Sequence, residues 1–187
     1  FFDDISALSE EEINKLPTWN KELLMTDHGV GSYVSRAFGK RCNRRNEEIA
    51  DMAERMSVAA EALVGAEYPR TEIEKGWKRT IAHTFHDDIT GTSVERVYQR
   101  SWNDYILSSN QLSNAYEGAA SEIIRQLDTS WTKGIAIVIN NTVEHARLGD
   151  VDLVIPADED KKYVRAFDEK GREGPAQVNF ISDGKMS

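Results

Sequence analysis

Apolar residues recur every three or four positions from residue 37 to residue 127, and no other feature constrains the fold of this chain as strongly. An α-helix turns about once every 3.6 residues, so this spacing places the apolar side chains on one helical face. Three segments have the pattern: residues 37–63, residues 71–90 and residues 92–127. Their connections are short, which favours an antiparallel three-helix bundle. The predicted core stripes are Phe38, Cys42, Ile49, Met52, Met56, Ala59 and Leu63; Ile73, Trp77, Ile81 and Phe85; and Val94, Tyr98, Trp102, Tyr105, Leu112, Tyr116, Ala119, Ile123 and Leu127.

Local signals predict where these helices begin and end. Gly65 is a typical helix stop, and Pro69 follows it closely. Ser9 and Glu12 have the spacing of a capping box and predict a short helix before Pro17. Thr71 and Glu74 repeat that spacing at the start of the second long segment.

The pattern changes after residue 129. A continuous apolar run, residues 134–139, and shorter candidates at residues 151–155, 163–167 and 177–181 are typical of β-strands. The sequence therefore predicts an α+β fold, with the bundle followed by the first strands of a β-sandwich. We expect a lead-in segment at residues 1–36, the helical domain at residues 37–130 and the β-domain from residue 131 to residue 187.

Charge and hydropathy exclude some functions. The net charge is −9, and the basic residues are interspersed with acidic ones, so we expect no nucleic-acid partner. No apolar run is long enough to span a membrane. The single cysteine excludes an internal disulfide.

The segment HTFHDDITGT, residues 83–92, carries the candidate chemistry. If the second helix continues through it, His86 lies nearly opposite the apolar stripe, His83 also faces outward, and Asp87 lies between the two faces. Histidine and aspartate are zinc ligands, but zinc needs three or four of them. An ordinary polar helix end has the same spacing, and spacing alone leaves both interpretations open.

Two motifs resemble the family-38 glycoside hydrolases, the class II α-mannosidases, in their bacterial form. HDDITGT at residues 86–92, followed by VYQRSWNDY, is similar to that family's HD-x-(I/V)-TGT segment. GSYVSR at residues 31–36, followed by KRCNRRNE, is similar to its G-x-Y-T-S-R/Q and K-R-x-N-R-x-x-E stretch. The upstream LPTWNKELLMTDHG is similar to the lead-in W-x-x-E-L-x-x-x-x-H-G. Two motifs in the same order make the resemblance specific.

The resemblance implies roles for four residues. His86 matches a histidine that ligates the catalytic zinc, and Asp87 matches the neighbouring aspartate that lines the sugar subsite. Tyr33 falls on the aromatic residue of G-x-Y, near the same pocket. His28 matches the lead-in histidine and is expected at the pocket rim. Val34 stands where the family usually has threonine, so the hydroxyl contact expected there is not available.

The resemblance also implies a larger enzyme that hydrolyses terminal α-linked mannose with retention of configuration. Its nucleophile, its acid/base and its other zinc ligands would lie on an N-terminal catalytic domain, and a further β-domain would follow. We therefore expect this chain alone to be inactive and to bind zinc poorly. The expected substrate is a mannose-containing glycan, and a glycan-degrading bacterial enzyme would act in the periplasm or outside the cell. The alternative is a non-catalytic helical module for binding or packing in a larger carbohydrate-active protein.

Overall fold

The computed structural model describes residues 5–20, 29–156, 163–179, 181–182 and 185–186. The predicted site residue His28 lies outside the described residues. The chain forms two compact units, Phe1–Thr142 and Val143–Ser187. Across the described residues, every helix falls short of the combined length and hydropathy that a membrane crossing requires.

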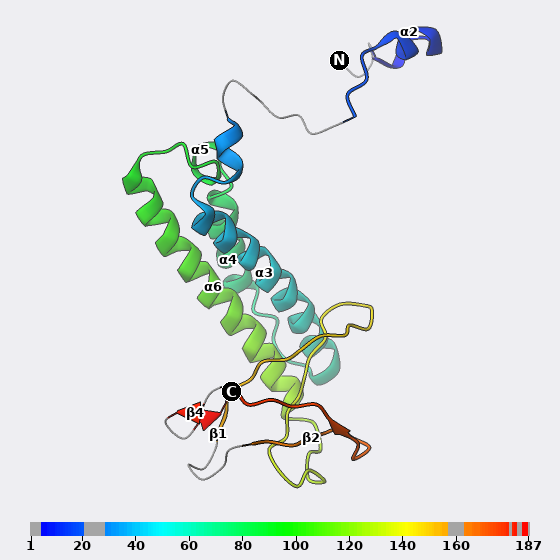
Figure 1. The fold of residues 1–187 in the computed structure, drawn as a ribbon, viewed down its shortest axis with the longest axis vertical. Helices are drawn as coiled ribbons and strands as arrows, with labels where there is room; N and C mark the ends of the chain where they lie inside the picture. Colours follow the sequence, from blue (N-terminus) through cyan, green and yellow to red (C-terminus); the bar gives the residue numbers. More distant parts are fainter. Residues whose placement is uncertain (1–4, 21–28, 157–162, 180, 183–184, 187) are drawn as a thin grey trace. The chain divides into compact units, whose positions relative to one another are not determined.

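Three long helices of the first unit pack side by side (Figure 1). In chain order the helical elements are α2 (Glu10–Lys15), the 3-10 turn η1 (Val30–Tyr33), α3 (Ala37–Val64), α4 (Arg70–Ala82), α5 (His86–Ile89) and α6 (Glu95–Ile124). Cross-helix contacts fix the directions. Asn46 of α3 reaches Tyr105 of α6, and Ala60 of α3 packs near Ala119 of α6, so these two helices are parallel. α4 runs against α6.

Helix ends follow the predicted signals in two places. The Ser9 side chain accepts from the Glu12 backbone N–H while the Glu12 carboxylate accepts from the Ser9 N–H, so this capping box is confirmed. Gly65 ends α3 with φ 70°, and the N–H groups of Gly65 and Ala66 donate to the last carbonyls of the helix. The capping box predicted at Thr71 is wrong, because α4 begins one residue earlier with Pro69 as its N-cap.

The core between these helices is made of small and polar residues as well as apolar ones. Tyr98, Tyr105, Leu112 and Ala119 are buried, as the spacing predicts. The predicted stripes are nevertheless wrong at several positions, whose side chains are exposed: Phe38, Leu63, Ile81, Phe85, Val94 and Leu127. Buried polar residues take part of the core: Asn43, Asn46, Ser57, Thr80, Ser101 and Ser108.

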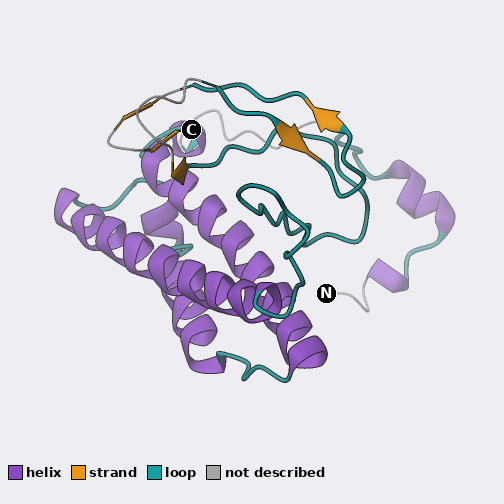
Figure 2. Cartoon of the chain, turned by 90° about the horizontal axis from the view of Figure 1, so that it is seen from below, coloured by secondary structure: helices purple, strands orange, loops and turns teal. Residues whose placement is uncertain are grey.

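The second unit has little regular structure, and its strands are two residues long (Figure 2). β1 (Ile155–Pro156), β5 (Lys185–Met186) and β4 (Ile181–Ser182) form one antiparallel sheet in that order; β2 (Ala166–Phe167) and β3 (Glu173–Gly174) form the other. The strand predicted at residues 134–139 is wrong. Those residues are assigned no strand, and no described strand pairs with them. An apolar run forms a strand only where a partner satisfies its backbone.

Candidate functional site

The segment HTFHDDITGT forms a corner between α4 and α6. α4 ends at Ala82, His83 is its C-cap, and the short helix α5 starts at His86 with Phe85 as N-cap. The N–H groups of His83 and Thr84 donate to the carbonyls of Thr80 and Ile81, which tightens the last turn before the bend. The expectation of a continuous helix is therefore wrong, and so is an outward-facing His83, whose side chain is buried.

His86 and Asp87 are the exposed polar pair of this corner. Their side chains are 77% and 57% exposed, and His86 Nε2 lies 3.5 Å from Asp87 Oδ2. The Phe85 ring lies beside the imidazole, with the ring centroids 4.3 Å apart. An imidazole nitrogen and a carboxylate oxygen side by side in solvent are available to a metal ion or to sugar hydroxyls.

The two sequence motifs meet at this corner, although they lie some fifty residues apart. The Ser35 hydroxyl, next to η1, donates to the carbonyl of Thr90. Lys40 Nζ donates to the carbonyls of Ser35 at 2.5 Å and Ile89 at 2.7 Å, so one ammonium group holds both segments. Burial lowers the pKa of Lys40. The start of α3 and the end of α5 are thus tied by backbone-directed hydrogen bonds.

Gly91 is required where these segments touch. Its φ is 83°, in the left-handed region that favours glycine. A Cβ at this position would lie 2.4 Å from Ser35 Oγ and 3.0 Å from Arg36 Cγ. The glycine of the TGT sequence therefore allows the close approach of Ser35.

Arg36 has the one positive φ, 51°, among the described residues other than glycine. A left-handed conformation costs an ordinary residue about 1–2 kcal/mol. Contacts to α6 offset this cost. The guanidinium lies 4.3 Å from the Tyr98 ring centroid and donates to Glu95 at 2.7 Å. The strained turn at Arg36 lies beside the corner, as strained residues at functional sites commonly do.

Tyr33 ends η1, and its side chain is exposed, as is that of Val34. Ser35, two residues later, brings the backbone of this segment to α5. Among the described residues, no hydrogen bond or ring contact joins the Tyr33 side chain to His86 or Asp87.

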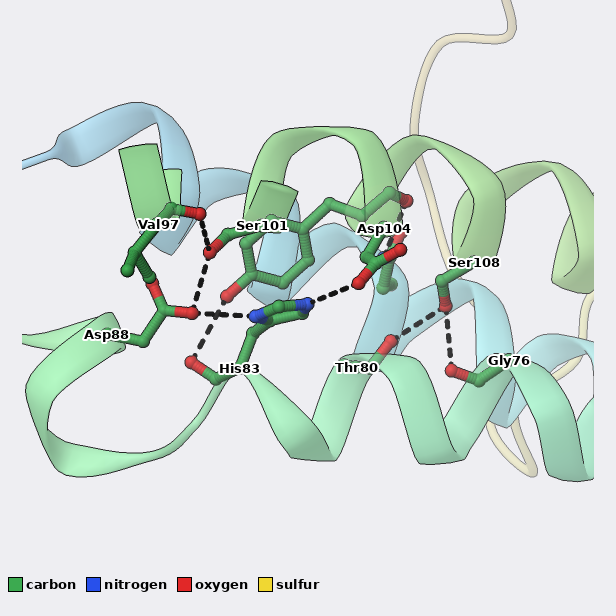
Figure 3. A network of polar contacts seen from close by, with 10 residues as sticks. Gly76, Thr80, His83, Asp88, Val97, Ser101, Asp104 and Ser108 are labelled. Atoms are coloured by element: carbon green, nitrogen blue, oxygen red, sulfur yellow. Dashed lines mark hydrogen bonds and ion pairs between the residues drawn. The ribbon is translucent and has the colours of Figure 1, made fainter. Parts of the chain in front are cut away.

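The corner also contains a partly buried polar network that the sequence pattern does not predict (Figure 3). His83 Nδ1 lies 2.6 Å from Asp88 Oδ2, and His83 Nε2 lies 3.1 Å from Asp104 Oδ2. The Ser101 hydroxyl donates to the same Asp88 oxygen at 2.7 Å. The Tyr105 ring packs on His83, with centroids 5.2 Å apart. These residues join the end of α4, the middle of α5 and the face of α6.

The raised pKa of Tyr105 predicts a loss of stability in alkaline solution. Burial raises the pKa of its phenol, and the Asp88 carboxylate raises it further. An unfolded tyrosine ionises at about pH 10, so above that pH the folded state binds more protons than the unfolded state. The stabilisation present below about pH 10 is then lost as pH rises toward the folded pKa, by at most about 1.4 kcal/mol per pH unit.

Urea unfolding at about pH 8 and about pH 10.5 would measure this dependence. Tyr105→Phe is the matched control. The free energy of unfolding should differ less between the two pH values in that variant than in the wild-type protein. An equal difference in both chains would contradict the assignment to Tyr105.

The described residues do not form a complete metal site. No group of three or more His, Cys, Asp or Glu side chains among them is arranged to hold a metal ion. His86 is nonetheless a suitable zinc ligand in chemistry and exposure. A zinc ion held through His86 would need further ligands from residues outside the described part of the chain.

Comparison with known proteins points to the same family as the two sequence motifs. A profile described as "Alpha mannosidase middle domain" matches residues 30–123, the region from η1 to the last turn of α6. The α-mannosidase of Saccharomyces cerevisiae is 31% identical over 101 residues, which is 53% of this chain and 9% of that protein. Alpha-mannosidase 2C1 of Homo sapiens is 32% identical over 101 residues, 54% of this chain and 10% of that protein. The mouse protein of that name is 31% identical over 97 residues, 51% of this chain and 9% of that protein. The chain thus spans about a tenth of the length of these relatives, and it belongs to the family-38 α-mannosidases through their middle domain.

Proposed function

We propose that this chain is the middle part of a longer retaining α-mannosidase that removes terminal α-linked mannose from glycans. One observation carries the proposal. His86 and Asp87 lie exposed and adjacent on α5, and the GSYVSR segment is hydrogen-bonded directly to the end of that helix. A generic helical bundle has no need to join those two segments at a strained turn and a glycine.

In this proposal His86 contributes one nitrogen ligand to zinc, and Asp87 accepts a hydrogen bond from a mannose hydroxyl. Zinc, when bound, orients the sugar through its hydroxyls and stabilises developing charge. The exposure of the imidazole supports this role, because a ligand for a shared site must be reachable from another domain. Tyr33 and His28 are proposed at the rim of the same sugar pocket.

The remaining groups come from outside this chain. The nucleophile, the acid/base and the other zinc ligands are proposed on an N-terminal catalytic domain that packs over the α5 corner. Residues 1–36 then lead in from that domain, residues 37–130 form the middle domain, and residues 131–187 begin the C-terminal β-sandwich. The relatives that match are themselves named α-mannosidases, which supports this assignment.

The test is His86→Ala in the full-length protein, with zinc content measured by elemental analysis and hydrolysis measured on an aryl α-mannoside. Loss of a direct ligand should weaken zinc binding by more than about 100-fold, the upper end of the effect of removing an outer-shell partner. Activity should fall with the metal.

His145→Ala provides the matched control, since it also removes a histidine, but one that lies in the second unit. It should keep full zinc and activity. If His86→Ala also kept both, the assignment of His86 would be wrong, and a non-catalytic binding or packing module would become the better description.

A further inference from the structure

The buried histidine of the corner, His83, has no part in the proposed function so far. It lies at the end of α4, and both ring nitrogens face carboxylates on other helices. Its side chain and that of Asp88 are each only 11% exposed. A carboxylate as shielded as that of Asp88 is costly unless it is hydrogen-bonded, so Asp88 depends on its contacts with His83 and Ser101.

Asp88 is the link to the exposed pair, because it follows Asp87 directly on the same short helix. Its Oδ2 atom accepts from the Ser101 hydroxyl at 2.7 Å and lies 2.6 Å from His83 Nδ1. A four-residue helix has too few internal hydrogen bonds to fix its own orientation. Outside contacts must therefore do so, and among the described residues the side-chain hydrogen bonds from α5 to His83 and to Ser101 of α6 are made by Asp88.

Asp104 anchors the other side of the ring. His83 Nε2 lies 3.1 Å from its Oδ2, and Tyr105 both packs on the ring and donates from its hydroxyl to the His83 carbonyl at 3.4 Å. The ring is thus fixed by α6 on one side and reaches α5 on the other (Figure 3).

We propose that His83 is a positioning residue: by bridging Asp88 and Asp104, it holds α5 against α6 in the orientation that presents His86 and Asp87. The expected effect on zinc binding rests on the proposed function. The claim that His83 holds α5 against α6 does not depend on it. Ser35 and Lys40 bind the carbonyls of Thr90 and Ile89 at the end of α5, so α5 is also held by the segment that starts α3.

The experiment compares His83→Ala, Asp88→Ala and the double variant in the full-length protein. Hydrogen exchange is read at the Ile89 and Gly91 amides, which donate to Phe85 and Asp88 within the corner. His83→Ala should speed their exchange by about 10-fold or more and weaken zinc binding by about 10-fold, as loss of outer-shell support does. The double variant should add little to either single one, since all three break the same bridge.

Met56→Ala controls for a general loss of stability. Met56 is buried with Ala60, Ala119 and Ala120, a cluster that does not include the corner. It should speed exchange throughout the bundle without a selective effect at Ile89 and Gly91, and it should leave zinc affinity unchanged. A selective effect of His83→Ala on exchange at Ile89 and Gly91, together with reduced zinc affinity, would support positioning.

Two results would overturn the proposal. Unchanged exchange at Ile89 and Gly91 in His83→Ala would show that the bridge does not hold α5. Faster exchange with unchanged zinc affinity, in a protein where His86→Ala does lose zinc, would show that holding α5 is irrelevant to the site. If His86→Ala itself retains zinc, the proposed function fails instead, and the exchange measurement alone then decides what His83 does.

Discussion

Replacing Gly91 by alanine is expected to lower the free energy of unfolding of the helical unit by roughly 2–4 kcal/mol, from backbone strain and from a steric clash together. The strain arises because φ at Gly91 is 83°. The clash arises because the new Cβ would lie 2.4 Å from Ser35 Oγ. Ser35 would have to move, and its hydrogen bond to the Thr90 carbonyl would be lost. Urea unfolding followed by far-ultraviolet circular dichroism would measure the change.

Gly65→Ala is the matched control for the strain alone. Gly65 has φ 70°, but a Cβ there would meet nothing within 4 Å. It should therefore destabilise by about 1–2 kcal/mol. An equal loss at the two positions would mean that Ser35 moves aside freely and that its contact with Thr90 contributes little.

Gly91→Ala should also impair the proposed site, by more than the loss of stability alone explains. Gly91 lies between α5 and the GSYVSR segment, so a displaced Ser35 would shift both motifs relative to each other. In the full-length protein we expect Gly91→Ala to lose the proposed mannosidase activity under conditions where Gly65→Ala keeps it.

Local sequence signals predicted several features because one or two residues determine them. The Ser9–Glu12 capping box and the Gly65 stop depend only on side chains and backbone near them. The buried seam of α6 is predictable for a different reason, its periodicity: Tyr98, Tyr105, Leu112 and Ala119 repeat every seven residues.

The corner could not be predicted in this way. At the bend after Ala82, His83 contacts Asp88 and Asp104, and Asp104 lies more than twenty residues further along the chain. Helical periodicity continued through that bend and placed His83 outside. The exposure of His86 agrees with the periodicity argument, although the continuous helix on which that argument relied does not exist.

The polar part of the core was also missed, because periodicity counts only apolar residues. The Asn46 amide donates to the Tyr105 carbonyl at 3.0 Å. Thr80 and Ser108 share a hydrogen bond of 2.8 Å, and Ser108 also donates to the carbonyl of Gly76 at 2.8 Å. Small hydroxyl residues satisfied in this way let helices approach closely, and their partners are known only once the fold is known.

Gly76 of α4 lies against Leu112 of α6, and Gly76→Ala should destabilise the helical unit although alanine is the better helix former. In an open helix the change would gain about 1 kcal/mol. Here a Cβ would lie 2.6 Å from Leu112 Cγ and 2.7 Å from its Cδ2. Leu112 is 0% exposed, so its side chain has no solvent to move into. Overpacking of this kind costs about 1–3 kcal/mol, and the displaced α4 would also weaken the Ser108 hydrogen bond.

A second substitution decides whether the clash is the cause. Leu112→Ala alone should cost about 2–5 kcal/mol by leaving a cavity. In that background Gly76→Ala should become stabilising, because the obstacle is gone and the helix propensity of alanine remains. Gly118→Ala is the matched control: it lies on α6 with nothing within 4 Å of its Cβ, and should stabilise by about 0.5–1 kcal/mol in either background. If Gly76→Ala changed the free energy of unfolding in the same direction with and without Leu112, the close contact between α4 and α6 would not be what requires glycine at position 76.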